Sequence, residues 1–395
     1  MKEEEDLQRV IRSVVASEFW SICQSDKKEE GFMKKVLALL MSIFLIVFSA
    51  GCGGTDTAKK NDADGKKTVG VLMPNKVVKR WIKDGADIKR QLEEKGYAVD
   101  LRYAENEPPT QIKQIDEMIK NGVSCLVITP IDSTKLVDVL DKAKKNNIPV
   151  ISYDRLLMDT NAVSYYATFD NKGVGVLIGR YVEEKLGLKS GKGPYNIEFF
   201  AGSRDDNNAN FLNTGLFEVL QPYIDNKQLI VPSEQTDLDL ISILRWSQEA
   251  AENRMEDILT NYYADGKKLD VVIAPSDTIS YGIENILEKH GYKVGENWPI
   301  ITGQDAEIEG LKNILSGKQT MTVFKDTRVL ASKCVTMVEA VLDGKEPEIN
   351  DSVSYDNRKF VVPSYLCTPV VVDKSNLKKE LIDSGFYTED DLKTK

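Results

Sequence analysis

The chain has 395 residues, of which 42% are hydrophobic and 29% are charged, and its formal net charge is −10. An acidic balance argues against nucleic acid as a partner, because carboxylates repel phosphates. There is one histidine, His290, and the five cysteines are scattered, so no clustered His/Cys zinc site, P-loop or Gly-x-Ser-x-Gly elbow can be traced. We therefore expect a binding protein without metal or cofactor, and not an enzyme.

A secretory signal is predicted at residues 33–52. It consists of the basic start Met33-Lys34-Lys35, an apolar run over residues 36–48, and small residues before Cys52. The run is too short for a spanning helix, which needs about 20 apolar residues, and fits the core of a signal peptide. Cys52 directly after small residues resembles a bacterial lipobox, although Ser49 stands where Leu is usual. An ordinary signal with a chance cysteine is the alternative, but we expect lipidation of Cys52.

Residues 1–32 precede this signal, although a signal peptide should begin a chain. We interpret them as a mis-assigned leader and Met33 as the true start, because codons for Glu29-Glu30-Gly31 can spell a purine-rich ribosome-binding site. Residues 53–66 are polar and rich in Gly, Asp and Lys, which is typical of a flexible linker.

From residue 68 onward, short apolar strands alternate with amphipathic helices. In the first part, strands are predicted over 68–73, 97–103, 123–128 and 150–153, and helices over 79–95, 110–121 and 133–146, the last capped by Ser133. In the second part, strands are predicted over 196–200, 229–231, 271–274, 299–302 and 320–324, with helices over 209–220, 248–260 and 307–315, then a helix over 326–342 and a strand over 370–372. This alternation predicts an α/β fold of two doubly wound parallel-sheet lobes.

Two features of the second part invite a catalytic interpretation that we do not favour. The run Gly173 to Gly179 resembles a dinucleotide-binding fingerprint, but its last spacing is one residue too long, and Asp170 before it fits a helix cap. We interpret these glycines as helix-packing residues. His290 is expected on the last turn of a helix that ends before Gly291, where its charge suits the helix dipole.

Polar side chains follow most of the predicted strands. They are Asp154-Arg155 after 150–153, Asp205 to Asn208 after 196–200, Ser276-Asp277 after 271–274, Gln304-Asp305 after 299–302, and Lys325 after 320–324. Open parallel sheets bind ligands beyond the carboxyl ends of their strands. Carboxylates and amides can each bind two sugar hydroxyls, and guanidinium supplies paired donors. The apolar face of a pyranose needs an aromatic ring, for which Trp81 and Trp246 are candidates.

Other interpretations of the same residues stay open. An Asp or Asn after a strand is often only a helix N-cap, and Trp246 on an amphipathic segment is often core. Several Asp residues could hold a metal, although the interleaved Arg and Lys would compete with it. Paired carboxylates also carry out glycoside hydrolysis. The recurrence of the pattern in both lobes favours binding.

Several short motifs resemble the D-xylose-binding branch of the ribose-binding-like, type I periplasmic sugar receptors. The matching stretches are Arg80-Trp81, Tyr153-Asp154-Arg155, Phe169 to Lys172, Asp206 to Ala209, Gly303 to Ala306, Gln319 to Lys325 and Leu366 to Pro369. The resemblance covers residues 68–392 and implies two lobes joined by three crossing strands. It implies a first lobe made of residues 68–171 plus 323–355 and a second lobe made of residues 172–322 plus 356–392.

The resemblance also implies a role for individual residues. Sugar contacts are implied for Arg80, Asp154 and Arg155 of the first lobe, for Asp206, Asn208, Trp246 and Asp305 of the second, and for Lys325 near the hinge. To these we add Trp81 as an aromatic candidate and Ser276 and Asp277 from the strand-end pattern. Ser276 stands where the family usually has Asn, and Lys79 replaces a common acidic residue. Preference for D-xylose over other sugars therefore rests on the remaining matches.

The expected activity is capture of a monosaccharide by lobe closure, with D-xylose as the preferred ligand. An ABC permease is the expected partner, for a monomeric receptor anchored by lipid to the outer face of the cell membrane. Two alternatives remain: a sugar sensor read by a membrane kinase or chemoreceptor, and a tethered sugar-processing enzyme, against which the single histidine counts.

Overall fold

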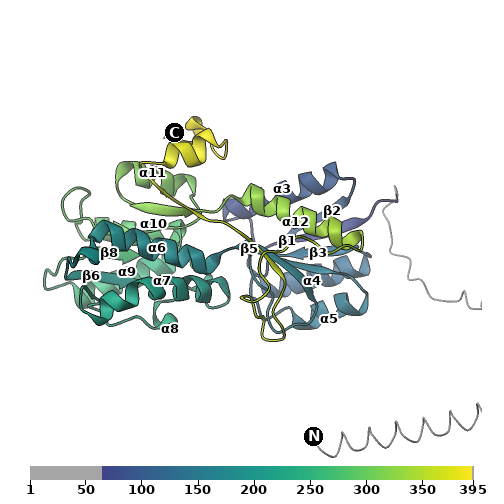
Figure 1. The fold of residues 1–395 in the computed structure, drawn as a ribbon, viewed down its shortest axis with the longest axis horizontal. Helices are drawn as coiled ribbons and strands as arrows, with labels where there is room; N and C mark the ends of the chain where they lie inside the picture. The colour runs from purple at the N-terminus through teal and green to yellow at the C-terminus, as the bar shows by residue number, and fades with distance from the viewer. Residues whose placement is uncertain (1–64, 394–395) are drawn as a thin grey trace, which may run out of the picture. The chain divides into compact units, whose positions relative to one another are not determined.

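The computed structural model describes residues 65–393. The leader, the signal with Cys52 and nearly all of the predicted linker lie outside the described residues. Within them, two α/β lobes are built on separate sheets (Figure 1). No helix among residues 65–393 is long and apolar enough to cross a membrane.

The first lobe is built on a six-stranded parallel sheet with the order β11-β5-β4-β3-β1-β2. In chain order, its strands are β1 (Thr68–Met73), β2 (Ala98–Tyr103), β3 (Cys125–Ile128), β4 (Val150–Tyr153), β5 (Val163–Phe169) and β11 (Ser364–Cys367). The helices are α3 (Lys79–Glu94), α4 (Pro108–Lys120), α5 (Val137–Lys145) and α12 (Thr327–Leu342). Successive residues of β1 face opposite sides of the sheet. Val71 packs in the core under α3 and α12, and Leu72 packs in the core under α4 and α5, so both faces of the sheet are covered.

The second lobe has a four-stranded parallel sheet, β7-β6-β8-β9, and an antiparallel pair, β10-β12. Its strands are β6 (Tyr195–Phe199), β7 (Leu229–Ile230), β8 (Val271–Ile273), β9 (Ile300–Ile301), β10 (Met321–Phe324) and β12 (Val370–Asp373). Its helices are α6 (Asn171–Leu186), α7 (Asn208–Asp225), α8 (Leu238–Ile241), α9 (Gln248–Tyr262), α10 (Asp277–Lys289) and α11 (Ile308–Ser316). One core lies under α6 and α7, and another under α9 and α10.

The chain passes between the lobes three times. The crossings run from β5 to α6, from β10 to α12, and from β11 to β12, and each connecting segment is only a few residues long. This agrees with the predicted fold class of two doubly wound lobes joined by three crossing strands. Three short connections between two lobes form an arrangement that permits hinge closure.

Two details of the sequence-based prediction are wrong. Residues 364–367 fall within the range 356–392 expected in the second lobe, yet β11 pairs with β5 of the first sheet. Ser133 does not cap a helix, because α5 begins only at Val137, and the Ser133 amide instead donates to the Asp205 carbonyl at 3.0 Å. Both errors arise from contacts between residues distant in sequence, which local patterns do not encode.

The helix cap predicted at Asp170 is confirmed, and so is helix packing at Gly175 and Gly179, whereas Gly173 adjoins the cap itself. The Asp170 carboxylate accepts a hydrogen bond from the Gly173 amide at 2.8 Å and caps α6. A Cβ on Gly175 would lie 1.9 Å from the carbonyl oxygen of Leu212 in α7, so this glycine allows the two helices to touch. His290 follows the last residue of α10, with its Nε2 2.8 Å from a Glu256 carboxylate oxygen.

Candidate binding site between the lobes

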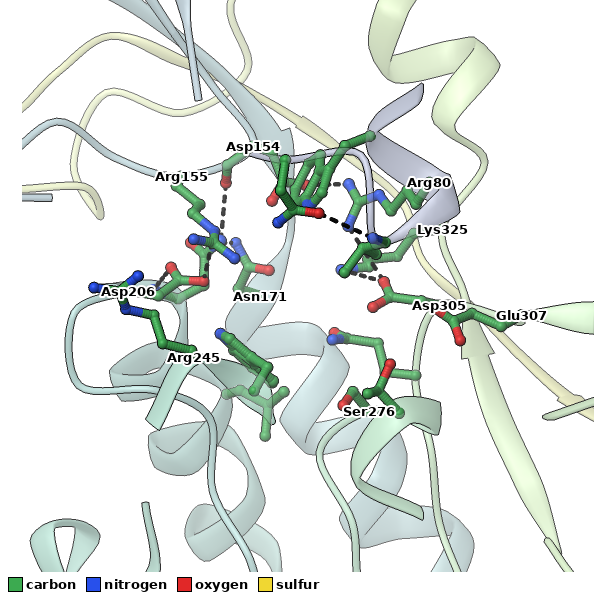
Figure 2. Close-up of a pocket in the computed structure, with 18 of the residues that line it drawn as sticks. Arg80, Asp154, Arg155, Asn171, Asp206, Arg245, Ser276, Asp305, Glu307 and Lys325 are labelled. Carbon is green, nitrogen blue, oxygen red and sulfur yellow. Dashed lines mark hydrogen bonds and ion pairs between the residues drawn. The ribbon is translucent and has the colours of Figure 1, made fainter. Parts of the chain in front are cut away.

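A cavity lies between the lobes, beyond the carboxyl ends of their strands (Figure 2). Its lining includes all the predicted ligand-binding residues except Asp277, namely Arg80, Trp81, Asp154, Arg155, Asp206, Asn208, Trp246, Ser276, Asp305 and Lys325. Side chains that are far apart in the sequence are therefore brought together at one place, from both lobes.

Two of the lining Asp residues, each placed after a strand, have an unusual backbone conformation. Asp154 directly follows β4 and has φ 59°, and Asp305 follows β9 by a few residues and has φ 93°. L-residues rarely adopt this left-handed region, and such strain gathers at functional sites. The Asp154 carbonyl accepts hydrogen bonds from the hydroxyls of Tyr166 and Thr168, at 2.6 and 2.8 Å, which hold the turn in place.

Arg80 joins the two lobes at this site. It lies in the first turn of α3, where its guanidinium donates to the Asp154 carboxylate of its own lobe and, at 3.3 Å, to Asp305 of the other. Asp84, one turn later and fully buried, has its Oδ2 3.5 Å from Arg80 Nε. The guanidinium also lies over the Trp81 ring, 4.7 Å from its centroid, which fixes the plane of the side chain.

Lys325 adds a second cation to this cluster. Lys325 Nζ lies 2.8 Å from Asp305, so that carboxylate faces two cations. Burial opposes ionisation of Asp154, but Arg80, Lys325 and Arg155 together outweigh it and hold the pKa of Asp154 below its usual value. Asp154 is therefore a carboxylate at neutral pH and accepts hydrogen bonds only.

A second ion pair spans the cleft. Arg155 Nε lies 3.1 Å from Asp206 of the second lobe, and its guanidinium lies 5.4 Å from the Trp81 ring centroid. Burial raises the pKa of Asp206, while Arg155 opposes that rise. The Asp206 carboxylate also accepts a hydrogen bond from the backbone amide of Asn208, at 3.0 Å. Asn208 is the first residue of α7 and lies beside the cavity.

Asn208 ties the lobes together through its side chain. Its Nδ2 donates to the Asp154 carbonyl at 2.8 Å, and its Oδ1 accepts from Tyr166 and Asn171, each at 3.0 Å. The side-chain amide carries two N–H groups, of which this bond uses one. Asn208 is thus a bridge between lobes as well as part of the cavity wall.

The cavity has an aromatic side chain in each lobe. Trp246 packs on Gly202, where a Cβ would lie 2.2 Å from the indole, so only glycine leaves room for the ring. The indole Nε1 of Trp246 is buried and has no acceptor within residues 65–393. Ser276 lines the cavity and also caps α10, accepting the Ile279 amide at 3.3 Å.

Asp277 is not a cavity residue, contrary to the prediction. Its carboxylate is fully buried and accepts from Gln319 at 2.7 Å, from Thr322 at 2.8 Å and from the Glu307 amide at 2.8 Å. These bonds join α10 to β10 and to the start of α11. The side chain after Ser276 points into the lobe because successive residues at a helix start face different directions.

Sequence reasoning missed part of the wall. The additional lining residues are Asn75, Val78, Asn106, Asn171, Leu212, Arg245, Thr278 and Glu307. Gln304 also lines the cavity and was named by the strand-end pattern, although no sugar contact was assigned to it. Arg245, however, lies in an irregular turn with φ 58° and reaches the Asn106 carbonyl of the other lobe, which no local pattern signals.

The arrangement is suited to a neutral, hydroxyl-rich molecule. Carboxylates at Asp154, Asp206 and Asp305 accept hydrogen bonds, the paired cations donate them, and Trp81 and Trp246 supply aromatic surface. Among residues 65–393, no group of three or more His, Cys, Asp or Glu side chains is arranged to hold a metal ion. The site can therefore hold a ligand by charged hydrogen bonds and apolar contact.

Comparison with known proteins agrees with this geometry. The model of the periplasmic binding protein domain matches residues 69–346. The chain is 47% identical to the multiple sugar-binding periplasmic receptor ChvE of Rhizobium radiobacter, over 90% of this chain and 100% of that protein. It is 33% identical to the D-xylose-binding periplasmic protein of Escherichia coli K12, over 82% of this chain and 92% of that one.

A solved structure extends the similarity to three dimensions. An ABC transporter solute-binding protein from Clostridium phytofermentans, crystallised with β-D-glucose, is 51% identical, with a TM-score of 0.80, over 83% of this chain and 100% of that one. These relatives bind sugars and are not enzymes, and the family is extracytoplasmic, as the signal at residues 33–52 led us to expect. The chain therefore belongs to the periplasmic binding protein family, among its type I sugar receptors.

Proposed function

We propose that the chain captures an aldopyranose in the cleft between its lobes and delivers it to an ABC permease. The observation that carries the proposal is the cavity wall, in which Asp154 and Arg155 of one lobe face Asp206 and Asp305 of the other. A ligand held by both half-sites favours the closed form, because only that form makes both sets of contacts.

D-Xylose and D-glucose are the sugars that we propose as ligands. Xylose follows from the sequence motifs, and glucose from the Clostridium phytofermentans relative that was crystallised with it. The two differ only by the hydroxymethyl group at C5. The short side chain of Ser276 at the cavity wall leaves more room than the Asn usual in the xylose branch, which favours acceptance of both.

Titration calorimetry on residues 53–395 tests this proposal. With xylose, glucose, ribose, arabinose and galactose, we expect one-to-one binding of xylose and glucose near micromolar Kd, or about −8 kcal/mol. Tighter binding of another sugar would overturn the assignment of the ligand, and absence of heat with every sugar would overturn the proposal as a whole.

A signalling role is the second candidate, because the Rhizobium radiobacter relative is named a receptor. In that role the closed form is read by a membrane sensor kinase or chemoreceptor in place of a permease. Crosslinking in native membranes with and without sugar separates the two roles. Recovery of a permease only when sugar is present supports transport, and recovery of a sensor only when sugar is present supports signalling.

We propose that Cys52 carries the lipid anchor and that the mature chain begins there. Mass spectrometry of the native N-terminus tests this, and we expect a diacylglyceryl cysteine. We also expect a Cys52→Ala variant to be released from membranes. Peptides from residues 1–32 would contradict Met33 as the start. We also propose that the receptor is a monomer, which light scattering can check.

A further inference from the structure

The C-terminal segment, residues 377–392, packs on the second lobe. Leu377, Leu381 and Phe386 join a buried cluster with residues of α11, β10 and β12, and the Phe386 ring lies 4.7 Å from that of Phe324, edge to face. In Figure 1 the segment is the yellow stretch at the C-terminus, beside α11. Its aromatic anchor therefore moves with the second lobe.

The same segment touches the first lobe through two cations. Lys83 of α3 has its Nζ 3.5 Å from the centroid of the Phe386 ring, and 3.5 Å from the Phe386 carbonyl oxygen. Arg328 of α12 lies 5.1 Å from the same centroid and donates to the Ser384 carbonyl at 3.1 Å. Phe386 is only 8% exposed, so its ring is shielded from water, whereas the two cations that lie on it are partly exposed. Cation–π contacts gain strength as they lose water.

Both sides of this contact are held in position within their own lobes. Arg328 is fixed by Asp326, which accepts from its Nε at 2.9 Å and from its Nη2 at 2.7 Å. On the other side, the Tyr387 amide donates to the Leu381 carbonyl at 2.9 Å and closes the turn that carries Phe386. Arg328 and the turn that carries Phe386 are therefore ordered before they meet, so their contact costs little conformational entropy.

We infer that the C-terminal segment is a clasp between the lobes, which stabilises the closed form and slows release of bound sugar. The inference rests on the proposed function. Neither Lys83 nor Phe386 lines the sugar cavity, so the clasp acts on closure and not on recognition. Lys83 and Arg328 belong to the first lobe and Phe386 packs on the second, so we expect these contacts to be lost when the lobes separate. Contacts made in one form and not in the other shift a two-state equilibrium.

Stopped-flow measurement of sugar release tests the clasp. Lys83→Met keeps the length and apolar stem of the side chain but removes its charge. Lys89→Met, on the same helix, is the matched control, because Lys89 is exposed and pairs with Glu93 of its own helix. We expect Lys83→Met to release sugar about three- to tenfold faster, with the ranking of sugars unchanged, and Lys89→Met to match the wild type. Equal rates in both variants, or an altered ranking, would overturn the inference.

A double-mutant cycle with Phe386→Leu locates the effect. If the cation acts through the ring, Lys83→Met adds little to the release rate once Phe386→Leu is present, whereas fully additive effects would contradict the clasp.

A sugar-free measurement separates the clasp from the proposed function. Dyes on cysteines at the exposed positions Lys113 and Lys267, one in each lobe, report lobe separation by single-molecule energy transfer. We expect Lys83→Met to raise the open fraction without any ligand. An unchanged distribution would overturn the clasp, while absence of sugar binding by the wild type would overturn the proposed function alone.

Discussion

At the scale of single residues, Asp305 is the carboxylate whose position says most about the mechanism. It stands in the second lobe, yet it lies 3.3 Å from Arg80 of the first lobe and 2.8 Å from Lys325 at the hinge. A sugar hydroxyl entering the cavity therefore meets an acceptor that is already oriented by two cations. Preorganised charge of this kind strengthens hydrogen bonds to the ligand.

Replacing Asp305 with Ala is expected to weaken sugar binding by about 1–3 kcal/mol, because it removes an acceptor and leaves Arg80 and Lys325 with one partner fewer. Calorimetry on the variant measures the loss. Asp239→Ala is the control, since Asp239 is an exposed residue paired with Arg204 at the surface. An Asp305→Ala affinity equal to that of the wild type would remove Asp305 from the site.

Ser276 is the residue that we expect to set the breadth of sugar recognition. Ser276→Asn keeps a side chain able to cap α10, so the helix should remain intact. The longer amide fills cavity space next to the ligand, and we expect the affinity for glucose to fall about tenfold relative to that for xylose, which lacks the hydroxymethyl group. Competition binding with the two sugars measures the ratio, and a ratio unchanged from the wild type would refute the role.

The residue scale also shows where sequence reasoning stops. Strand-end polarity pointed correctly to Asp154, Asp206 and Asp305 as cavity-lining residues, but the same pattern pointed to Asp277, which is buried in the lobe and bonded to Gln319. The pattern reports that a side chain follows a strand. It does not report which way the side chain faces.

At the scale of elements, the contact of α6 with α7 supports the site from below. Asn171 at the start of α6 and Asn208 at the start of α7 meet in the cavity wall, with Nδ2 to Oδ1 at 3.0 Å. The helices can come this close because Gly175 faces the backbone of α7, and Gly215 faces that of α6, where a Cβ would lie 2.0 Å from the Lys172 carbonyl oxygen.

Gly175→Ala is expected to destabilise the protein by about 3 kcal/mol in urea unfolding, since overpacking between the helices outweighs the helix propensity that alanine adds. Gly179→Ala is the comparison, because its Cβ would meet the Val219 side chain at 2.8 Å and a backbone carbonyl, that of Leu216, only at 3.3 Å. The expected loss for Gly179→Ala is smaller. A Gly175→Ala variant as stable as the wild type would mean that the helices separate at little cost.

At the scale of the whole molecule, the site belongs to neither lobe alone. Arg80 with Asp305, and Arg155 with Asp206, are ion pairs between lobes, and Asn208 adds a hydrogen bond to the Asp154 carbonyl across the same gap. Bound sugar is therefore expected to stabilise both lobes together.

Thermal unfolding measures this coupling. Sugar at a thousand times its Kd is expected to add about 4 kcal/mol to the free energy of unfolding and to move the transitions of both lobes to higher temperature. Mannitol, an acyclic polyol, serves as the control for unspecific stabilisation. A shift confined to one lobe would show that the ligand contacts only that half of the cleft.

The sequence by itself determined the alternation of strands and helices, the two-lobed α/β class and the stretch of chain in which most cavity residues lie. These follow from periodicity and from strand-end polarity, which are local properties. Only the tertiary structure decided that Ser364–Cys367 joins the first sheet, that Asp277 is buried away from the cavity, and that Arg245 and Asn171 line it. Each of these depends on packing between residues distant in sequence, and no local pattern carries that information.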